Sequence, residues 1–206
     1  EAARAGKLEK LGQRLNVLTR SMNHHIDMQI ANARLLQLAH YQNRISAAEL
    51  VTDTVAAYPF RSTKESECAE VIVHRDFVFR GARAQFAGVL DNLIQNALRS
   101  LQAAGSLLNP GDLRIEVGSR GQEGRITVSD RGIGIDAAVL QRVFEPFFSS
   151  DHGTGHGLGL AFCRRVVAAS KGTIQVKSEI AAGAVFTITL PLDGQEHRSS
   201  TKGERA

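Results

Sequence analysis

The segment from Asp130 to Leu160 places two glycine clusters around an aromatic run, and it limits the possible folds of this chain more than any other stretch. It reads DRGIGIDAAVLQRVFEPFFSSDHGTGHGLGL. Glycine lets a backbone approach a ligand closely and tolerates positive φ. A β-type run, Arg125 to Ser129, precedes the segment, and a helical pattern from Leu158 to Ala169 follows it. A helix start offers unpaired N–H groups and the positive end of a dipole, both of which favour phosphate.

Either glycine cluster alone could belong to an ordinary turn, so the order of the motifs carries the argument. Upstream lies Asn92-Leu-Ile-Gln-Asn96-Ala97, followed by DxGxGI at 130–135, FEPFF at 144–148 and GxGLGL at 155–160. This order resembles the N, G1, F and G2 boxes of sensor histidine kinases, members of the GHKL ATPase superfamily. The resemblance covers roughly residues 47–192. It implies an α+β fold, the two-layer α/β sandwich known as the Bergerat ATP-binding fold.

The first part of the chain has a helical pattern of its own. Apolar residues recur at steps of three and four over residues 1–42, which predicts a long helix with one apolar face: Leu8, Leu11, Leu15, Leu18, Met22, Ile26, Ile30, Ala33 and Leu36. Such a face needs a partner, most simply another helix or a second copy of itself. We therefore expect residues 1–45 to form a helical dimerisation segment, residues 46–192 the ATP-binding domain, and residues 193–206 a disordered polar tail.

Within the expected domain, Ser46 followed by Glu49 has the pattern of a capping box and predicts a helix over 47–57. The alternating apolar residues of 70–80 predict a hairpin that turns at Arg75-Asp76. The remaining expectations are a loop over 60–68, a helix over 82–103, and hairpins that pair 113–118 with 125–130 and 173–178 with 184–190. Strand pairs separated by helices are typical of two packed layers.

Composition excludes several classes of protein. The formal net charge is +4, with acidic and basic residues mixed, which gives no basic patch for nucleic acid. The two cysteines do not form a CxxC pair, and this argues against a disulfide framework or a metal site of that type. No apolar run reaches the roughly 18 residues needed to span a bilayer, so no membrane contact is expected. We expect a cytoplasmic location, either alone or as the cytoplasmic part of a membrane-bound sensor.

The N-box-like segment carries the expected metal ligand. Asn92 and Asn96 are four residues apart and therefore share a helix face. The resemblance implies that Asn96 binds Mg²⁺ through its side-chain oxygen, since magnesium takes few protein ligands besides phosphate and water oxygens. Arg99 stands where the family usually has Lys or Arg to contact phosphate. Asn96 and Arg99 are thus the expected catalytic residues.

The resemblance also implies how ATP is bound. Asp130 is expected to accept a hydrogen bond from the adenine amino group, Gly132 and Gly134 to leave room for the base, and the second glycine cluster to line the phosphates. Phe144, Phe147 and Phe148 are expected to anchor a lid. The full set expected to bind ATP is Asn92, Asn96, Asp130, Gly132, Gly134, Ile135, Phe148, Gly155, His156, Gly157, Leu158 and Gly159.

The lid departs from the family pattern. Relatives often carry a Lys after the aromatic run, whereas this chain has Ser149-Ser150-Asp151-His152. Asp151 would repel a γ-phosphate unless its side chain points away. Charge neutralisation would then depend on Mg²⁺, Arg99 and either His152 or His156.

The phosphoacceptor motif of the family is not matched. The chain offers His24-His25 followed by Ile-Asp-Met-Gln, without the acid, Arg and Pro of that motif. Only 21 residues separate His24 from Ser46, or roughly 32 Å of helix, which suffices for one pass but not for a hairpin. We therefore expect the acceptor histidine upstream of Glu1. A degenerate motif at His24 is the alternative.

These observations predict a histidine kinase catalytic fragment that transfers the γ-phosphoryl group of Mg-ATP to a histidine in two-component signalling. Its expected partners are a second copy, through the N-terminal helix, and a response-regulator or receiver domain. YPF at 58–60 and DFVFRG at 76–81 also resemble hybrid kinases that sense α-hydroxyketone autoinducers. The alternative is an ATP-binding switch or ATPase without phosphotransfer. Chaperone-type and repair-type ATPases carry a catalytic Glu early in the N-box helix, where this chain offers only Asp91.

Overall fold

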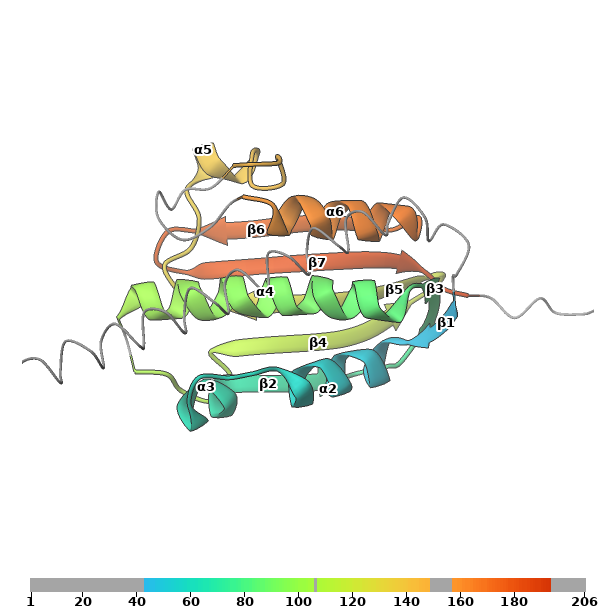
Figure 1. The fold of residues 1–206 in the computed structure, drawn as a ribbon, viewed down its shortest axis with the longest axis horizontal. Coiled ribbons are helices and arrows are strands. Elements are labelled where there is room, and N and C mark those ends of the chain that lie inside the picture. Colours follow the sequence, from blue (N-terminus) through green and yellow to red (C-terminus); the bar gives the residue numbers. More distant parts are fainter. Residues whose placement is uncertain (1–42, 106, 149–156, 194–206) are drawn as a thin grey trace, which may run out of the picture.

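A computed structural model describes residues 43–105, 107–148 and 157–193, which form a mixed five-stranded β-sheet with helices packed against one face and a separate strand pair (Figure 1). The five-stranded sheet has the order β2-β4-β5-β7-β6, and β1 and β3 form a separate pair. The predicted two-layer α/β sandwich is confirmed. The elements are β1 Asn43–Ser46, α2 Ala47–Ala57, α3 Thr63–Cys68, β2 Ala69–Val73, β3 Val78–Gly81, α4 Arg83–Ala104, β4 Leu113–Arg120, β5 Glu123–Asp130, α5 Ala137–Leu140, α6 Gly159–Ala169, β6 Thr173–Glu179 and β7 Gly183–Pro191.

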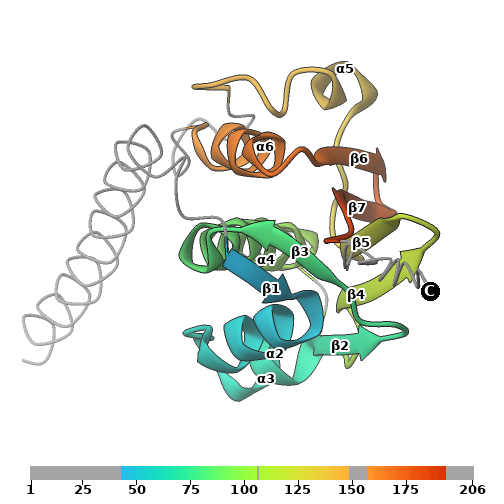
Figure 2. The same cartoon turned by 90° about the vertical axis from the view of Figure 1, so that its right-hand side faces the viewer.

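Alternation along the central strands creates the core. One face of β4, β5 and β7 is apolar and fully buried, and it packs beneath the helices: Leu113, Ile115, Val117, Ile126, Val128, Phe186, Ile188 and Leu190. The opposite face carries polar side chains such as Arg125, which is exposed. The domain therefore has one core, between the sheet and the helix layer (Figure 2).

Helix α4 is the centre of the helix layer. Its buried residues recur at helical spacing along its length and face the sheet: Phe86, Val89, Leu90, Asn92, Leu93, Ile94, Ala97, Leu98 and Leu101. The helix ends at Gly105, whose left-handed φ of 69° is the conformation that a glycine C-cap adopts without strain. The predicted helix over 82–103 is confirmed within one residue at each end.

The two C-terminal hairpins are confirmed, and each is longer than predicted. Strand β4 pairs antiparallel with β5, and β6 pairs antiparallel with β7. The predicted hairpin over 70–80 is wrong, because β2 pairs parallel with β4 whereas β3 pairs antiparallel with β1. Asp76 does not close a tight turn: its carboxylate accepts from the backbone of Ala48 at 2.8 Å and from the Ser46 hydroxyl at 2.7 Å. Asp76, which was predicted to lie in a turn, therefore stabilises the start of α2.

The predicted loop over 60–68 is also wrong, because its second half is helix α3. The Ser62 side chain caps this helix by accepting from the backbone of Glu65 at 3.2 Å. Glu65 is buried and accepts from the backbone of Arg61 and from the Gln102 amide, both at 2.8 Å. The cap predicted at Ser46 is confirmed, since its hydroxyl accepts from the backbone of Glu49.

Ion pairs join the small β1–β3 sheet to the end of β7. The Asp193 carboxylate lies 3.0 Å from Arg44 Nε and 2.9 Å from Arg80 Nε, and its side chain is only 12% exposed. The backbone N–H of Asp193 also donates to Val78 at 2.7 Å. The first and last described residues therefore meet at one corner of the domain.

Several predictions fall on residues outside those that the structure describes. These are the N-terminal helix with His24 and His25, the lid residues 149–156, and the tail over 194–206. Among the described residues, no helix is long and apolar enough to cross a membrane.

Candidate functional site

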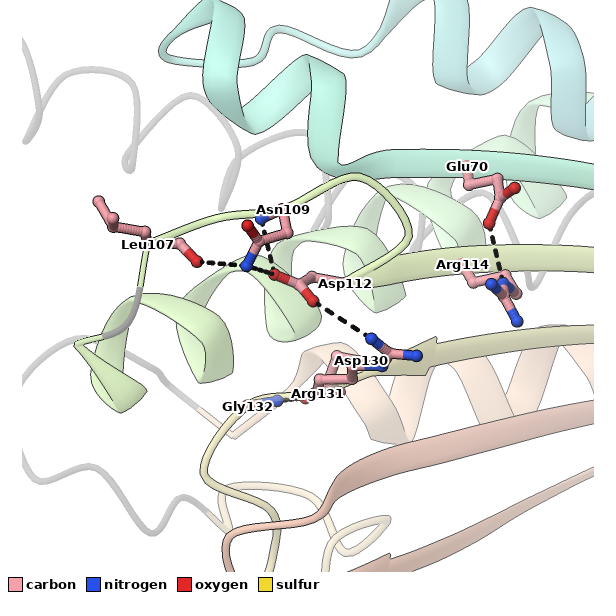
Figure 3. Close-up of polar contacts among 8 residues, drawn as sticks. All are labelled: Glu70, Leu107, Asn109, Asp112, Arg114, Asp130, Arg131 and Gly132. Carbon is pink, nitrogen blue, oxygen red and sulfur yellow. Dashed lines mark hydrogen bonds and ion pairs between the residues drawn. The ribbon is translucent and has the colours of Figure 1, made fainter.

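Asp130, the last residue of β5, supplies a buried carboxylate at the edge of the helix layer. It is 6% exposed, and its Oδ1 accepts from the backbone N–H of Gly132 at 2.9 Å (Figure 3). Burial raises the pKa of the Asp130 carboxyl above its usual range, and hydrogen bonds from Gly132, Ser100 and Ala184 oppose that rise. A desolvated acceptor of this kind suits a hydrogen-bond donor on a flat base.

The backbone that follows Asp130 is fixed by Asp112. The N–H of Arg131 donates to the Asp112 carbonyl at 3.1 Å, and its guanidinium turns toward the Asp112 carboxylate at 3.9 Å (Figure 3). The other Asp112 oxygen accepts from the backbone of Asn109 at 2.7 Å. The loop after α4 and the loop after β5 are thus held together.

Both glycines of the first cluster are packed tightly against protein backbone. A Cβ at Gly132 would overlap Ser100 on α4, and a Cβ at Gly134 would overlap the carbonyl oxygen of Glu179 at the end of β6. Gly134 also has a φ of 71°, which side chains disfavour. These glycines let the loop fit between α4 and the β6–β7 turn, in addition to any room that they leave for a base.

Ile135 completes this loop. Its backbone N–H donates to the Ser178 hydroxyl at 2.8 Å, and its partly buried side chain packs on the core. The N–H of Ala181, in the β6–β7 turn, donates to the carbonyl of Ile133 at 2.8 Å. Loop 131–135 is therefore bound on both sides.

On α4, the two asparagines differ in their surroundings. Asn92 is 4% exposed, and its amide nitrogen donates to the Gly88 carbonyl at 2.7 Å. Its amide oxygen faces Gly159 at the start of α6, where a Cβ would lie 2.6 Å away. Asn92 thus lies at the contact between α4 and α6, whereas Asn96 and Arg99, further along the helix, are partly exposed.

The start of α6 presents its first backbone N–H groups. Leu158 is the N-cap residue, and no side chain of the described residues caps this end. The first N–H groups of a helix have no partner within the helix, so they can bind anionic oxygens. Because Gly159 lies against Asn92, these donors are next to α4.

The phenylalanines of the aromatic run 144–148 differ in how deeply they are buried. Phe144 packs partly buried on the core, edge-on to Phe186 at 6.4 Å between centroids. Phe147 is 78% exposed, so of these two side chains only Phe144 packs on the core. Phe148 lies under the Arg142 guanidinium, 4.5 Å from its ring centroid.

The second glycine cluster meets the aromatic run. The N–H of Phe147 donates to the Gly157 carbonyl at 3.0 Å, and a Cβ at Gly157 would lie 2.5 Å from the backbone of Phe148. The residues on either side of 149–156 are thus in contact. Gly155 and His156 lie outside the described residues.

Sequence reasoning missed the residues that support the loop. Ser100, which donates to Asp130, lies four residues after Asn96, and this spacing could have marked it as part of the same helix face. Asp112 and Ser178 act through contacts between distant segments, which no local pattern reveals.

The side chains at this site could hold a magnesium ion whose other ligands are phosphate and water oxygens. The described residues contain no group of three His, Cys, Asp or Glu side chains that could hold a metal ion. Asn96 offers one amide oxygen, and Mg²⁺ commonly keeps several waters and phosphate oxygens beside one or two protein ligands.

Comparison with known proteins agrees with this geometry. Residues 81–194 match the family described as "Histidine kinase-, DNA gyrase B-, and HSP90-like ATPase". This range begins at the end of β3 and contains α4, the loop after Asp130 and the start of α6.

Similar curated proteins are sensor kinases. The CAI-1 autoinducer sensor kinase/phosphatase CqsS of Vibrio cholerae is 27% identical over 73% of this chain and 22% of its own length. The autoinducer 1 sensor kinase/phosphatase LuxN of Vibrio campbellii is 30% identical over 71% of the chain and 17% of its own. Sensor histidine kinase CitA of Klebsiella pneumoniae is 36% identical over 55% of this chain and 20% of its own length. The chain therefore spans about a fifth of these relatives.

Solved structures show the same fold. The catalytic domain of histidine kinase ThkA superposes with a TM-score of 0.62 at 23% identity, over 74% of this chain and 96% of that one. The mycobacterial sensor histidine kinase MprB gives 0.60 at 23% identity, over 75% of this chain and all of its own.

Proposed function

Because this chain belongs to the family of histidine kinase-, DNA gyrase B- and HSP90-like ATPases, we propose that it binds Mg-ATP and supplies the γ-phosphoryl group to a histidine in two-component signalling. The observation that carries this proposal is the buried Asp130 carboxylate, next to loop 131–135 and α4. The Asp130 carboxylate accepts from Gly132, Ser100 and Ala184, and its remaining lone pairs can accept from the adenine amino group.

At the phosphate end, three groups of this chain act together. Asn96 presents its amide oxygen for magnesium, Arg99 presents a guanidinium for phosphate oxygens, and the first N–H groups of α6 face the same end. Magnesium, when bound, neutralises charge that develops on the transferred group. In this proposal catalysis depends on positioning and on charge.

The residues before Asn92 on α4 favour transfer of the phosphoryl group over hydrolysis of ATP. One turn before Asn92 the chain has Gly88, next to the Phe162 ring, so no carboxylate is available there to activate water. Asp91 instead lines a hollow between α2 and α4 with Leu50 and Asp53. Burial raises the pKa of Asp91 to about 6.

Calorimetry of nucleotide binding tests the site. Asp130→Asn replaces an acceptor by a mixed donor and acceptor, so it should weaken ATP and ADP alike by about tenfold or more. Asn96→Ala should weaken Mg-ATP more than metal-free ADP. Unchanged binding in both variants would refute the site.

Phosphotransfer needs a separate test, which also addresses the switch alternative. Radiolabelled γ-ATP and Mg²⁺ are added to this chain, to a version extended upstream, and to His24→Gln. We expect acid-labile label only on the extended chain. Label on the shorter chain that disappears in His24→Gln would place the acceptor at His24, and no label on any histidine substrate would favour an ATP-binding switch. Dimerisation through residues 1–42 is part of the same proposal and is checked by light scattering.

A further inference from the structure

A cationic hollow lies on α4, beside the face that carries Asn96. The connection between α2 and α3 forms one wall and α4 forms the other. Its polar lining consists of Tyr58, Arg61, Glu65, Gln95, Arg99 and Gln102. Arg99 lies three residues after Asn96 on the helix, so it belongs to both surfaces.

The hollow contains two guanidinium groups and one carboxylate that is already engaged. Glu65 accepts from the backbone of Arg61 and from the Gln102 amide, both at 2.8 Å. Arg61 Nη1 reaches the Gln102 oxygen at 3.4 Å, a long hydrogen bond. Within the described ranges, neither Arg61 nor Arg99 forms an ion pair with a carboxylate. The hollow therefore has an excess of positive charge.

Tyr58 adds a hydroxyl donor. Burial and the nearby Asp91 charge raise the pKa of Tyr58 to about 12, so the hydroxyl stays protonated at neutral pH. Its ring packs against Phe60, with 4.8 Å between the centroids, which fixes the side chain in the wall.

The size of the hollow limits its occupant. Its volume is about 20 Å³, enough for one water-sized group and too small for a base or a sugar. Arg61, Arg99 and Tyr58 line it, and a set of donors of this kind favours an anionic oxygen. The sequence between Phe144 and Gly159 contains no Lys or Arg, whereas this face of α4 carries Arg99.

We propose that the hollow receives an oxygen of the γ-phosphoryl group of ATP, with Arg61 acting as a second cation beside Arg99. This inference rests on the proposed function, because it needs the phosphates to lie along Asn96 and Arg99. The hollow then distinguishes ATP from ADP, since only ATP carries the oxygen that fills it.

The test compares the affinities of Mg-ATP and Mg-ADP by calorimetry for the unmodified chain, Arg61→Ala and Arg61→Lys. Arg61→Ala should weaken ATP about tenfold and ADP less than twofold, since a charge-assisted hydrogen bond to the terminal phosphate is lost. Arg61→Lys keeps the charge but not the planar guanidinium, so its affinity for ATP should lie between those of the unmodified chain and Arg61→Ala. Tyr58→Phe should weaken ATP by a smaller factor and leave ADP unchanged.

Arg75→Ala is the matched control, because Arg75 is also exposed but follows the far end of β2. It should change neither affinity. Equal losses of ATP and ADP in Arg61→Ala, or no loss of either, would overturn the role of Arg61. If the unmodified chain binds neither nucleotide, the proposed function itself fails, and the role of Arg61 fails with it.

Discussion

Two segments border the proposed nucleotide site, and the protein holds them in opposite ways. Loop 131–135 is bonded to Asp112 on one side and to Ser178 and the β6–β7 turn on the other. Segment 144–148 is anchored to the core through Phe144, whereas Phe147 contacts Gly157 and is otherwise largely exposed. Loop 131–135 is held by contacts with other elements of the domain, whereas most of segment 144–148 is held by contacts with nearby loop residues.

This difference implies a division of labour in binding. A surface that is already ordered loses little conformational entropy when a ligand arrives, so the adenine end can contribute affinity directly. Contacts between Phe147 and Gly157 can rearrange without disturbing the sheet, because they involve no strand. In the proposed complex, the phosphate end can therefore adjust to the ligand while the adenine end stays constant.

The largest effect is expected at Gly134. Gly134→Ala places a Cβ against the Glu179 carbonyl at a φ of 71°, so the free energy of unfolding should fall by at least about 3 kcal/mol. Gly121 is the control, since it has a φ of 62° but nothing within 4 Å of a Cβ, and its Ala variant should cost only about 1 kcal/mol. Denaturant titrations measure both. Equal costs would mean that loop 131–135 is not fixed by this contact.

The next effect compares two phenylalanines of the same segment. Phe144→Ala should cost about 2 kcal/mol, since the side chain is partly buried against Phe186. Phe147→Ala should change stability by less than about 0.5 kcal/mol, because the side chain is 78% exposed. Thermal unfolding of both variants is the measurement. A large loss in Phe147→Ala would show that the segment is held more firmly than its contacts indicate.

Gly157→Ala should have a smaller effect on stability and a clear effect on binding. Its Cβ would lie against the backbone of Phe147 and Phe148, which can shift, so we expect a loss of about 1 kcal/mol from the positive φ of 65°. Nucleotide affinity should fall several-fold, because the phosphate end is displaced. A loss as large as that of Gly134→Ala would remove the contrast between the two segments.

The smallest effect is a dependence of stability on pH at Asp130. The folded state raises the pKa of this carboxyl, so the folded chain binds more protons than the unfolded chain, and stability from this group falls as pH rises above the ordinary value of 3.8. Asp130→Asn removes this loss. The stability of the variant relative to the parent should therefore be greater at pH 8 than at pH 4 in thermal unfolding. A difference that is constant with pH would contradict the raised pKa.

Local patterns were enough for the elements that depend on neighbours in sequence. The period of α4 and the alternation of β4 with β5 are determined within each segment, and both were predicted. Strand β2 shows where such patterns fail, because its parallel partner β4 comes from beyond α4. An alternating run with a polar pair at Arg75-Asp76 has the pattern of a hairpin, and only the distant partners β4 and β1 show that it is not one.

In the candidate site too, features marked by a local motif were predicted, and features that depend on distant contacts were not. Asp130 and Gly134 were marked by their motif, but the overlap of Gly134 with Glu179 depends on a turn about 45 residues away and could not be predicted. Helix α3 could have been predicted, because Ser62 and Glu65 repeat the spacing of Ser46 and Glu49. The roles of Asn96 and Arg99 in binding stay predictions.

The ion pairs of Asp193 with Arg44 and Arg80 have a consequence for chain connectivity. They bring residue 193 next to residue 43, so a linker of a few residues could join them and close the described domain into a ring. New ends could then be opened in the loop after α4, at Gly105, without breaking a strand pairing. Such a circular permutant should retain the fold, and for the same reason the domain can be inserted as a unit between other modules.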